Sequence, residues 1–171
     1  VVIPDSVVSI GTGAFASGGS LTAATVGAGV ESLGEHAFWD CPLTNLTLRS
    51  IPLSVPGIDG TEKQGLGHVF NATGYDVVIE PGVTNIGDRA FGGYCGLSSV
   101  SIPEGVTNIG DYAFVDCNSL LGVVLPPGVQ SIGRQAFGYC TRLASVSFPD
   151  GLRVIGSGAF DLSLSLRAVV I

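Results

Sequence analysis

Apolar and polar positions recur along the chain with a period of 23 residues, and an Ala-Phe pair is the clearest marker of the period. Such pairs end at Phe15, Phe38, Phe91, Phe114, Phe137 and Phe160, and Val69-Phe70 stands where a further copy is expected. A fixed period of ~20 to ~50 residues is the signature of a repeat architecture. The pattern therefore predicts a stack of seven units of ~23 residues.

Each unit contains an alternating stretch that is typical of a strand. In the unit that begins at Leu97, the residues Leu97, Val100 and Ile102 are apolar, whereas Ser99 and Ser101 are polar. Residues two apart lie on the same side of a strand, so this stretch has one apolar and one polar side.

A turn and a short helical turn are expected after the strand. Pro103-Glu104-Gly105 has the residues of a tight turn. Asp111 precedes Ala113 and Phe114 at the place where a short helical turn would begin, and its carboxylate is expected to cap free backbone N–H groups there. Ala113 and Phe114 are expected to point inward.

A unit with one strand cannot bury its own apolar side, so neighbouring units must stack. The fold class predicted for residues 1–171 is a single-domain α/β solenoid of leucine-rich-repeat type, wound as a right-handed coil. One parallel β-sheet is expected on its concave face, with short helical turns or loops opposite. The third repeat is irregular, because the step from Leu48 to Leu66 is eighteen residues where that from Ile3 to Ile10 is seven, which places an insertion at 49–65.

The repeat also resembles a known family. From Leu97 to Cys117 the sequence reads Leu-x-x-Val-x-Ile-Pro-x-Gly-Val-x-x-Ile-Gly-x-x-Ala-Phe-x-x-Cys, which resembles the BspA-like leucine-rich repeat over nearly the whole chain. The resemblance implies a bacterial or protozoan surface protein that binds host proteins or other cells. It implies no catalytic residues.

The outward strand positions are the first candidate for a partner-binding surface. They carry no charged and no aromatic residue: Val2, Thr25, Thr47, Val78, Ser101, Val124, Ser147 and Val170. Contiguous apolar surface on a soluble protein commonly has a binding use. The alternative interpretation is that small β-forming residues simply keep the sheet flat and tight.

The insertion is the second candidate, because loops that protrude from a solenoid often bind partners. Its charged residues Asp59, Glu62 and Lys63 are candidate contacts. The alternative is a tolerated surface insertion, since the entropic cost of closing a loop grows slowly with its length.

Charge and motifs exclude several other functions. The net charge is −7, from 7 Lys and Arg against 14 Asp and Glu, so no basic stripe is available for nucleic acid. No apolar run approaches the ~20 residues of a membrane span. Gly11 to Ala16 matches a dinucleotide fingerprint but no βαβ unit follows, so no cofactor is expected. Neither a metal motif nor a catalytic triad is recognisable, and the chain is not expected to be an enzyme.

Four cysteines fall close to one position of the repeat, at Cys41, Cys95, Cys117 and Cys140. Adjacent copies would place Cys117 and Cys140 within disulfide reach, at ~5 Å. Buried free thiols are expected, because a cross-link would distort a regular stack.

The function predicted from these observations is a non-enzymatic protein–protein interaction module of an exported surface protein, which adheres to host or matrix proteins or to other cells. The alternative is a structural solenoid that self-associates into a homo-oligomer through its apolar concave face or its uncapped ends. The chain begins at Val1 without a recognisable signal peptide and has no methionine, so a processed or trimmed chain is expected.

Overall fold

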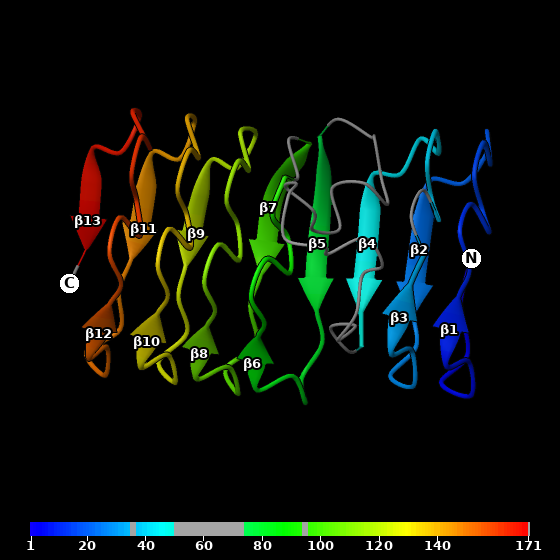
Figure 1. The fold of residues 1–171 in the computed structure, drawn as a ribbon, viewed down its shortest axis with the longest axis horizontal. Coiled ribbons are helices and arrows are strands. Elements are labelled where there is room, and N and C mark those ends of the chain that lie inside the picture. The colour runs from blue at the N-terminus through cyan, green and yellow to red at the C-terminus, as the bar shows by residue number, and fades with distance from the viewer. Residues whose placement is uncertain (35–36, 50–73, 94–95, 171) are drawn as a thin grey trace.

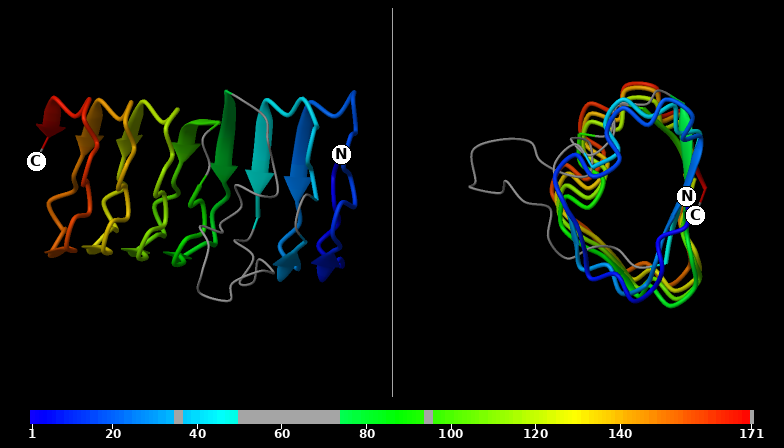
Figure 2. Two further views of the ribbon diagram at one scale, coloured as in Figure 1. Left: turned by 45° about the horizontal axis from the view of Figure 1, so that its top comes forward. Right: turned by 90° about the vertical axis from the view of Figure 1, so that its right-hand side faces the viewer.

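The computed structural model shows a parallel β-solenoid whose coils lie side by side in a nearly straight row, with the two ends of the chain at opposite ends of the row (Figure 1). It describes residues 1–34, 37–49, 74–93 and 96–170. Viewed along the stack, the coils superimpose closely (Figure 2). The third repeat, Val69-Phe70 and the insertion fall largely within residues 50–73, outside the described residues, so the count of seven repeats is not confirmed.

Each regular coil contributes one strand to a front side and one short strand to the other side. The front strands are β2 (Ala23–Val26), β4 (Asn45–Leu48), β5 (Tyr75–Ile79), β7 (Leu97–Ser101), β9 (Gly122–Val124), β11 (Ser145–Ser147) and β13 (Ala168–Val170). The short strands are β1 (Ser9–Ile10), β3 (Ser32–Leu33), β6 (Asn85–Ile86), β8 (Asn108–Ile109), β10 (Ser131–Ile132) and β12 (Val154–Ile155).

All described strand pairs are parallel, as the repeat predicts, but they do not form one sheet. The front side has a sheet β2-β4-β5-β7 and a separate sheet β9-β11-β13. The short strands form β1-β3 and β6-β8-β10-β12. The expectation of a single sheet was therefore wrong, because the front strands form two separate sheets.

The helical turns are not confirmed, because the described residues contain turns and strands but no helix. Two residues of a coil adopt left-handed backbone angles on either side of the Ala-Phe pair, such as Tyr112 (φ 58°) and Asp116 (φ 61°), or Gln135 (φ 47°) and Tyr139 (φ 60°). A right-handed helix cannot continue through such residues. No membrane-crossing helix, long and apolar, occurs in this part of the chain either.

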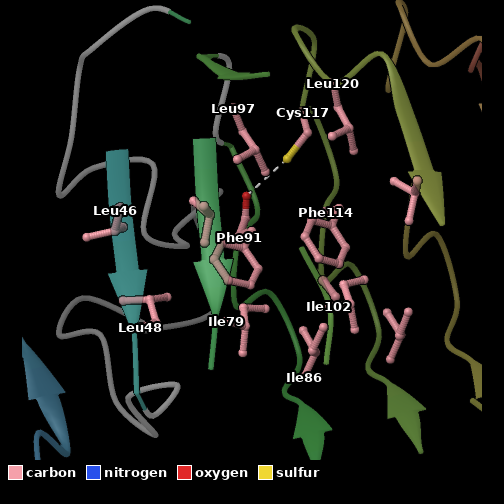
Figure 3. Close-up of a cluster of buried hydrophobic side chains, with 14 of the residues drawn as sticks. Leu46, Leu48, Ile79, Ile86, Phe91, Leu97, Ile102, Phe114, Cys117 and Leu120 are labelled. Carbon is pink, nitrogen blue, oxygen red and sulfur yellow. Dashed lines mark hydrogen bonds between the residues drawn. The ribbon is translucent and has the colours of Figure 1, made fainter. Parts of the chain in front are cut away.

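The core is a column of phenylalanine rings. Phe114 is fully buried, and its ring stacks on those of Phe91 and Phe137, with centroids 5.0 Å apart on each side and interplanar angles of 7° and 3°. The stack continues to Phe160 at 5.3 Å. Leucine, isoleucine and valine columns from both strand sets surround the rings (Figure 3).

Two further columns connect neighbouring coils by hydrogen bonds. Asp111 Oδ1 accepts the backbone N–H of Arg134 at 2.7 Å, and Asp88 Oδ1 accepts that of Asp111 at 2.8 Å. The expectation that Asp111 caps its own turn was wrong, since the carboxylate binds the next coil. The thiols of Cys117 and Cys140 donate to the carbonyl oxygens of Phe91 and Phe114 in the preceding coil, at 3.3 and 3.1 Å.

Candidate functional site

The parallel register gathers the outward residues of the front strands into a surface that we call the strand face. Val2 pairs with Thr25, and the register continues through Thr47 and Val78 to Ser101. Beyond the division, Val124 pairs with Ser147 and Ser147 with Val170. The structure thus brings all eight strand positions singled out from the sequence to the front side.

Valines are the most exposed apolar residues of the strand face. Val124 is 74% exposed, Val2 67% and Val78 43%, whereas Thr25 and Thr47 between them are half-buried. Hydrogen-bonded ladders hold these residues in place, so the surface is ordered before any partner arrives. Such a surface can bury apolar area on a partner but offers few groups for chemistry.

A second row of outward residues lies two positions earlier on each strand, and the sequence reasoning missed it. It consists of Ala23, Asn45, Asp76, Ser99, Gly122, Ser145 and Ala168. Asp76 is the single charged residue in the two described rows, and its Oδ1 accepts the Ser99 hydroxyl at 2.6 Å. The period-2 alternation of a strand was the signal that could have found this row.

The strand face is divided between β7 and β9, which form no ladder. A 3.4 Å hydrogen bond from Leu121 N–H to Ser98 O links the two coils at this point. Val100 points inward beside the division and is half-buried, whereas its equivalents Val123 and Val146 are 3% and 1% exposed. The inner wall of the solenoid is therefore partly uncovered here.

The insertion residues Asp59, Glu62 and Lys63 lie outside the described residues. The start of the insertion is anchored by Arg49, which lies 3.4 Å from Asp5 Oδ1 and 3.2 Å from Glu80 Oε2. Asp5 also accepts the backbone N–H of Ala28 at 2.8 Å, and this bond, followed by the contact with Arg49, lowers the pKa of the Asp5 carboxyl.

No group of three or more His, Cys, Asp or Glu side chains in the described part of the chain is placed to hold a metal ion. His36 and His68 fall outside the described residues. Cys41, Cys117 and Cys140 are buried and free, and burial raises the pKa of the Cys140 thiol to about 12.

The fold and its inter-coil columns define a parallel β-solenoid of leucine-rich-repeat type. More particularly, the chain belongs to the family described as the BspA type leucine rich repeat region, which matches residues 1–56 and 69–171 in six copies. The resemblance predicted from the repeat is therefore confirmed. Leucine-rich repeats are generally protein-interaction modules.

Solved structures of bacterial leucine-rich repeat proteins share this fold. The protein from T. pallidum is 25% identical, with a TM-score of 0.56 over 86% of this chain and 57% of its own. The protein from Bacteroides ovatus is 23% identical, with a TM-score of 0.58 over 98% of this chain and 53% of its own. The protein from Eubacterium ventriosum is 22% identical, with a TM-score of 0.63 over 94% and 42%. The chain thus spans about half the length of these proteins, and no curated protein matches it.

Proposed function

We propose that the chain is a non-enzymatic protein-binding module of an exported surface protein, and that its strand face contacts host or matrix proteins or other cells. The observation that carries the proposal is the row of exposed valines and small hydroxyl residues held in register on the front side. Exposed valines in an ordered row can bury apolar area on a partner, and exposed apolar surface often marks interaction sites on soluble proteins. The proposals of export and of adhesion are inferred from the family resemblance alone.

The composition of the strand face suits recognition by shape. Aromatic and Arg residues, which dominate most binding hot spots, do not occur in its two rows among the described residues. Affinity must then come from a flat area of small side chains whose backbone is already ordered, which lowers the entropic cost of binding. The insertion, with Asp59, Glu62 and Lys63, supplies a second contact region in this proposal.

A plate assay on immobilised matrix proteins tests the proposal. Val78→Lys combined with Val124→Lys places two charges on the strand face, and we expect binding to fall at least tenfold, about 1.4 kcal/mol. Val8→Lys is the matched control, because Val8 is 58% exposed and lies beside the short strand β1. Equal binding by both variants would contradict the role of the strand face.

Deletion of residues 53–63, which restores the usual step of seven from Leu48 to Leu66 and removes Asp59, Glu62 and Lys63, separates the two proposed contact regions. Arg49 and its ion pairs with Asp5 and Glu80 are retained in this variant. A loss of binding would assign the contact to the insertion, whereas full binding combined with the loss in the valine double variant would assign it to the strand face. Secretion is tested separately, by locating the protein with an antibody in fractionated cells.

Self-association is a second candidate function, favoured by the exposed valines of the strand face. Val124 is 74% exposed and Val78 43%. Apolar side chains on the same face of two copies can bury each other. Light scattering distinguishes this function from binding to a foreign protein.

A further inference from the structure

Asp76 differs from every other residue in the two described rows of the strand face, because it alone carries a charge. The equivalent position of the other front strands holds alanine, asparagine, serine or glycine, so the repeat does not require a carboxylate there. The Asp76 side chain is exposed, and its strand β5 lies between β4 and β7 in the row of front strands (Figure 1).

Several other carboxylates of the chain hold neighbouring coils together. Asp88 and Asp111 each accept a backbone N–H of the next coil, at 2.8 and 2.7 Å, and Asp5 does the same at 2.8 Å. The side chain of Asp76 accepts a hydroxyl and no backbone N–H, and no cationic side chain among the described residues lies within ion-pair distance of it. The negative charge of Asp76 is therefore not used to join the described coils.

A β-bulge places a hydrogen-bond donor opposite this carboxylate. β7 has one additional residue, Ser98, between Leu97 and Ser99, whereas Tyr75 and Asp76 are adjacent on β5. Ser99 consequently pairs with Asp76, and its hydroxyl donates to Oδ1 at 2.6 Å. Bulges often re-aim a side chain next to a functional site. The hydrogen bond restricts the carboxylate before a partner binds, and an ionised carboxylate still has lone pairs on both oxygens for a further donor.

An exposed valine lies beside the carboxylate on the same side of β5. Val78 is two residues after Asp76 and is 43% exposed. Residues two apart on a strand are separated by ~7 Å, which the aliphatic stem of an arginine or lysine can span. Such side chains commonly lay their stem on apolar surface while the charged end reaches a polar group. The register neighbours of Val78, Thr47 and Ser101, are small.

We propose that Asp76 is the charged anchor of the strand face, and that the partner is a protein segment with an arginine or lysine side chain seated on it. The cation pairs with the carboxylate of Asp76, and the stem covers Val78. The net charge of −7 attracts a basic partner at long range, and Asp76 gives this attraction a fixed point on the face. The inference rests on the proposed function, because it names the chemistry of the partner that the strand face contacts.

A titration with synthetic peptides tests the anchor without any natural partner. The probe is a blocked peptide of alternating serine and valine with one central arginine, and the matched control has citrulline, which keeps the shape of arginine but has no charge. In nuclear magnetic resonance spectra of the intact chain, the arginine peptide should shift the amides of Asp76, Val78 and Ser99 and bind at least ~3-fold more tightly than the citrulline peptide. A third peptide with lysine shows whether the charge alone or the planar guanidinium is selected. Equal affinity for the arginine and citrulline peptides, or no shift at Asp76, would overturn the proposal.

Two aspartate variants with the same change in net charge separate the anchor from general attraction. Asp76→Asn keeps the size of the side chain and an acceptor for the Ser99 hydroxyl, but removes the charge. Asp150→Asn is the matched control, because Asp150 is exposed and follows β11, outside both rows of the strand face. Asp76→Asn should bind the arginine and citrulline peptides equally, whereas Asp150→Asn should keep the preference of the wild type. Equal losses in the two variants would show that only the overall charge attracts the peptide, and the anchor would be wrong.

The plate assay then distinguishes failure of the anchor from failure of the proposed function. We expect Asp76→Asn to weaken binding of a matrix protein ~10-fold, about 1.4 kcal/mol, and to reduce the dependence of binding on salt. If Val78→Lys combined with Val124→Lys abolishes binding while Asp76→Asn leaves it unchanged, the strand face is retained and the charged anchor is wrong. If no matrix protein binds the wild-type chain but the peptides behave as expected, the proposed function fails and the anchor at Asp76 stands.

Discussion

Replacing Phe114 by alanine tests the core of the solenoid most directly. Phe114 is fully buried, and its ring stacks on Phe91 and on Phe137 at centroid distances of 5.0 Å. The substitution removes a ring between two others that are fixed to different coils. The coils are held at their spacing by backbone hydrogen bonds, such as Phe114 N–H to Ala136 O at 2.7 Å, so they cannot collapse to fill the space.

The expected loss is large for a domain of this size. Phe→Ala changes in cores cost ~3–5 kcal/mol when the surroundings relax little. Each stacked aromatic pair adds ~0.5–1.5 kcal/mol beyond burial, and two such pairs disappear here. We therefore expect a loss near the upper end, about 4–5 kcal/mol, against a total stability of ~5–15 kcal/mol.

Urea unfolding followed by circular dichroism measures this loss, with Phe160→Ala as the matched control. Phe160 is only half-buried and stacks in parallel on one ring, Phe137, at 5.3 Å, so its loss should be about half as large. A loss below ~1 kcal/mol for Phe114→Ala would show that the column is not a buried stack. Equal losses at the two positions would show that stacking on both sides contributes nothing.

Three further predictions concern the thiols, the carboxylate column and association. Denatured protein without reductant should contain four free thiols, and the native Cys140, with its pKa of about 12, should not react at pH 8; finding two free thiols would indicate a bridge from Cys117 to Cys140. Asp111→Ala should lower stability by about 1 kcal/mol in urea unfolding, with Glu104→Ala, an exposed turn residue, as a control near zero. The chain should scatter light as an oligomer at ~100 μM, and Val78→Lys combined with Val124→Lys should reduce its mass if the strand face is responsible; a monomeric wild type would exclude association.

Much of the fold could be predicted from the sequence because the same side chains recur at one period. Stacking places equal residues above one another, so the column of Phe114 and the outward row through Val78 follow from counting along the chain. The chemistry of a possible partner could not be predicted in the same way. A strand face of valine, serine and threonine carries no catalytic or charged pattern from which a ligand can be read.

The absence of helix could have been foreseen from the two positions of the repeat that flank the Ala-Phe pair, but it was not. Glycine occupies the left-handed positions in some coils, at Gly13 and Gly158 before the pair and at Gly93 after it. Other coils have Tyr112 and Tyr139 at these positions, and such residues give no local sign of a left-handed backbone. The carboxylate of Asp111 favoured the interpretation as a helix cap, whereas the contact it makes is to the next coil, which a single repeat cannot reveal.

The division of the strand face shows how a change in one coil acts on another that is itself regular. The sequence of β9 matches the repeat, and nothing in it indicates an unpaired edge. The cause is the missing residue between Tyr75 and Val77, and β7 transmits it by bulging to keep its ladder with β5. A strand can follow one neighbour or the other when their spacings differ, and the longer ladder on the β5 side prevails. Inserting one serine between Tyr75 and Asp76 should therefore return β7 to β9, join Ile102 N–H to Val124 O, and slow amide exchange at Ile102 to the rate of its equivalent Leu125, whose N–H donates to Ser147 O at 3.1 Å. Fast exchange at Ile102 in that variant would show that the division arises elsewhere.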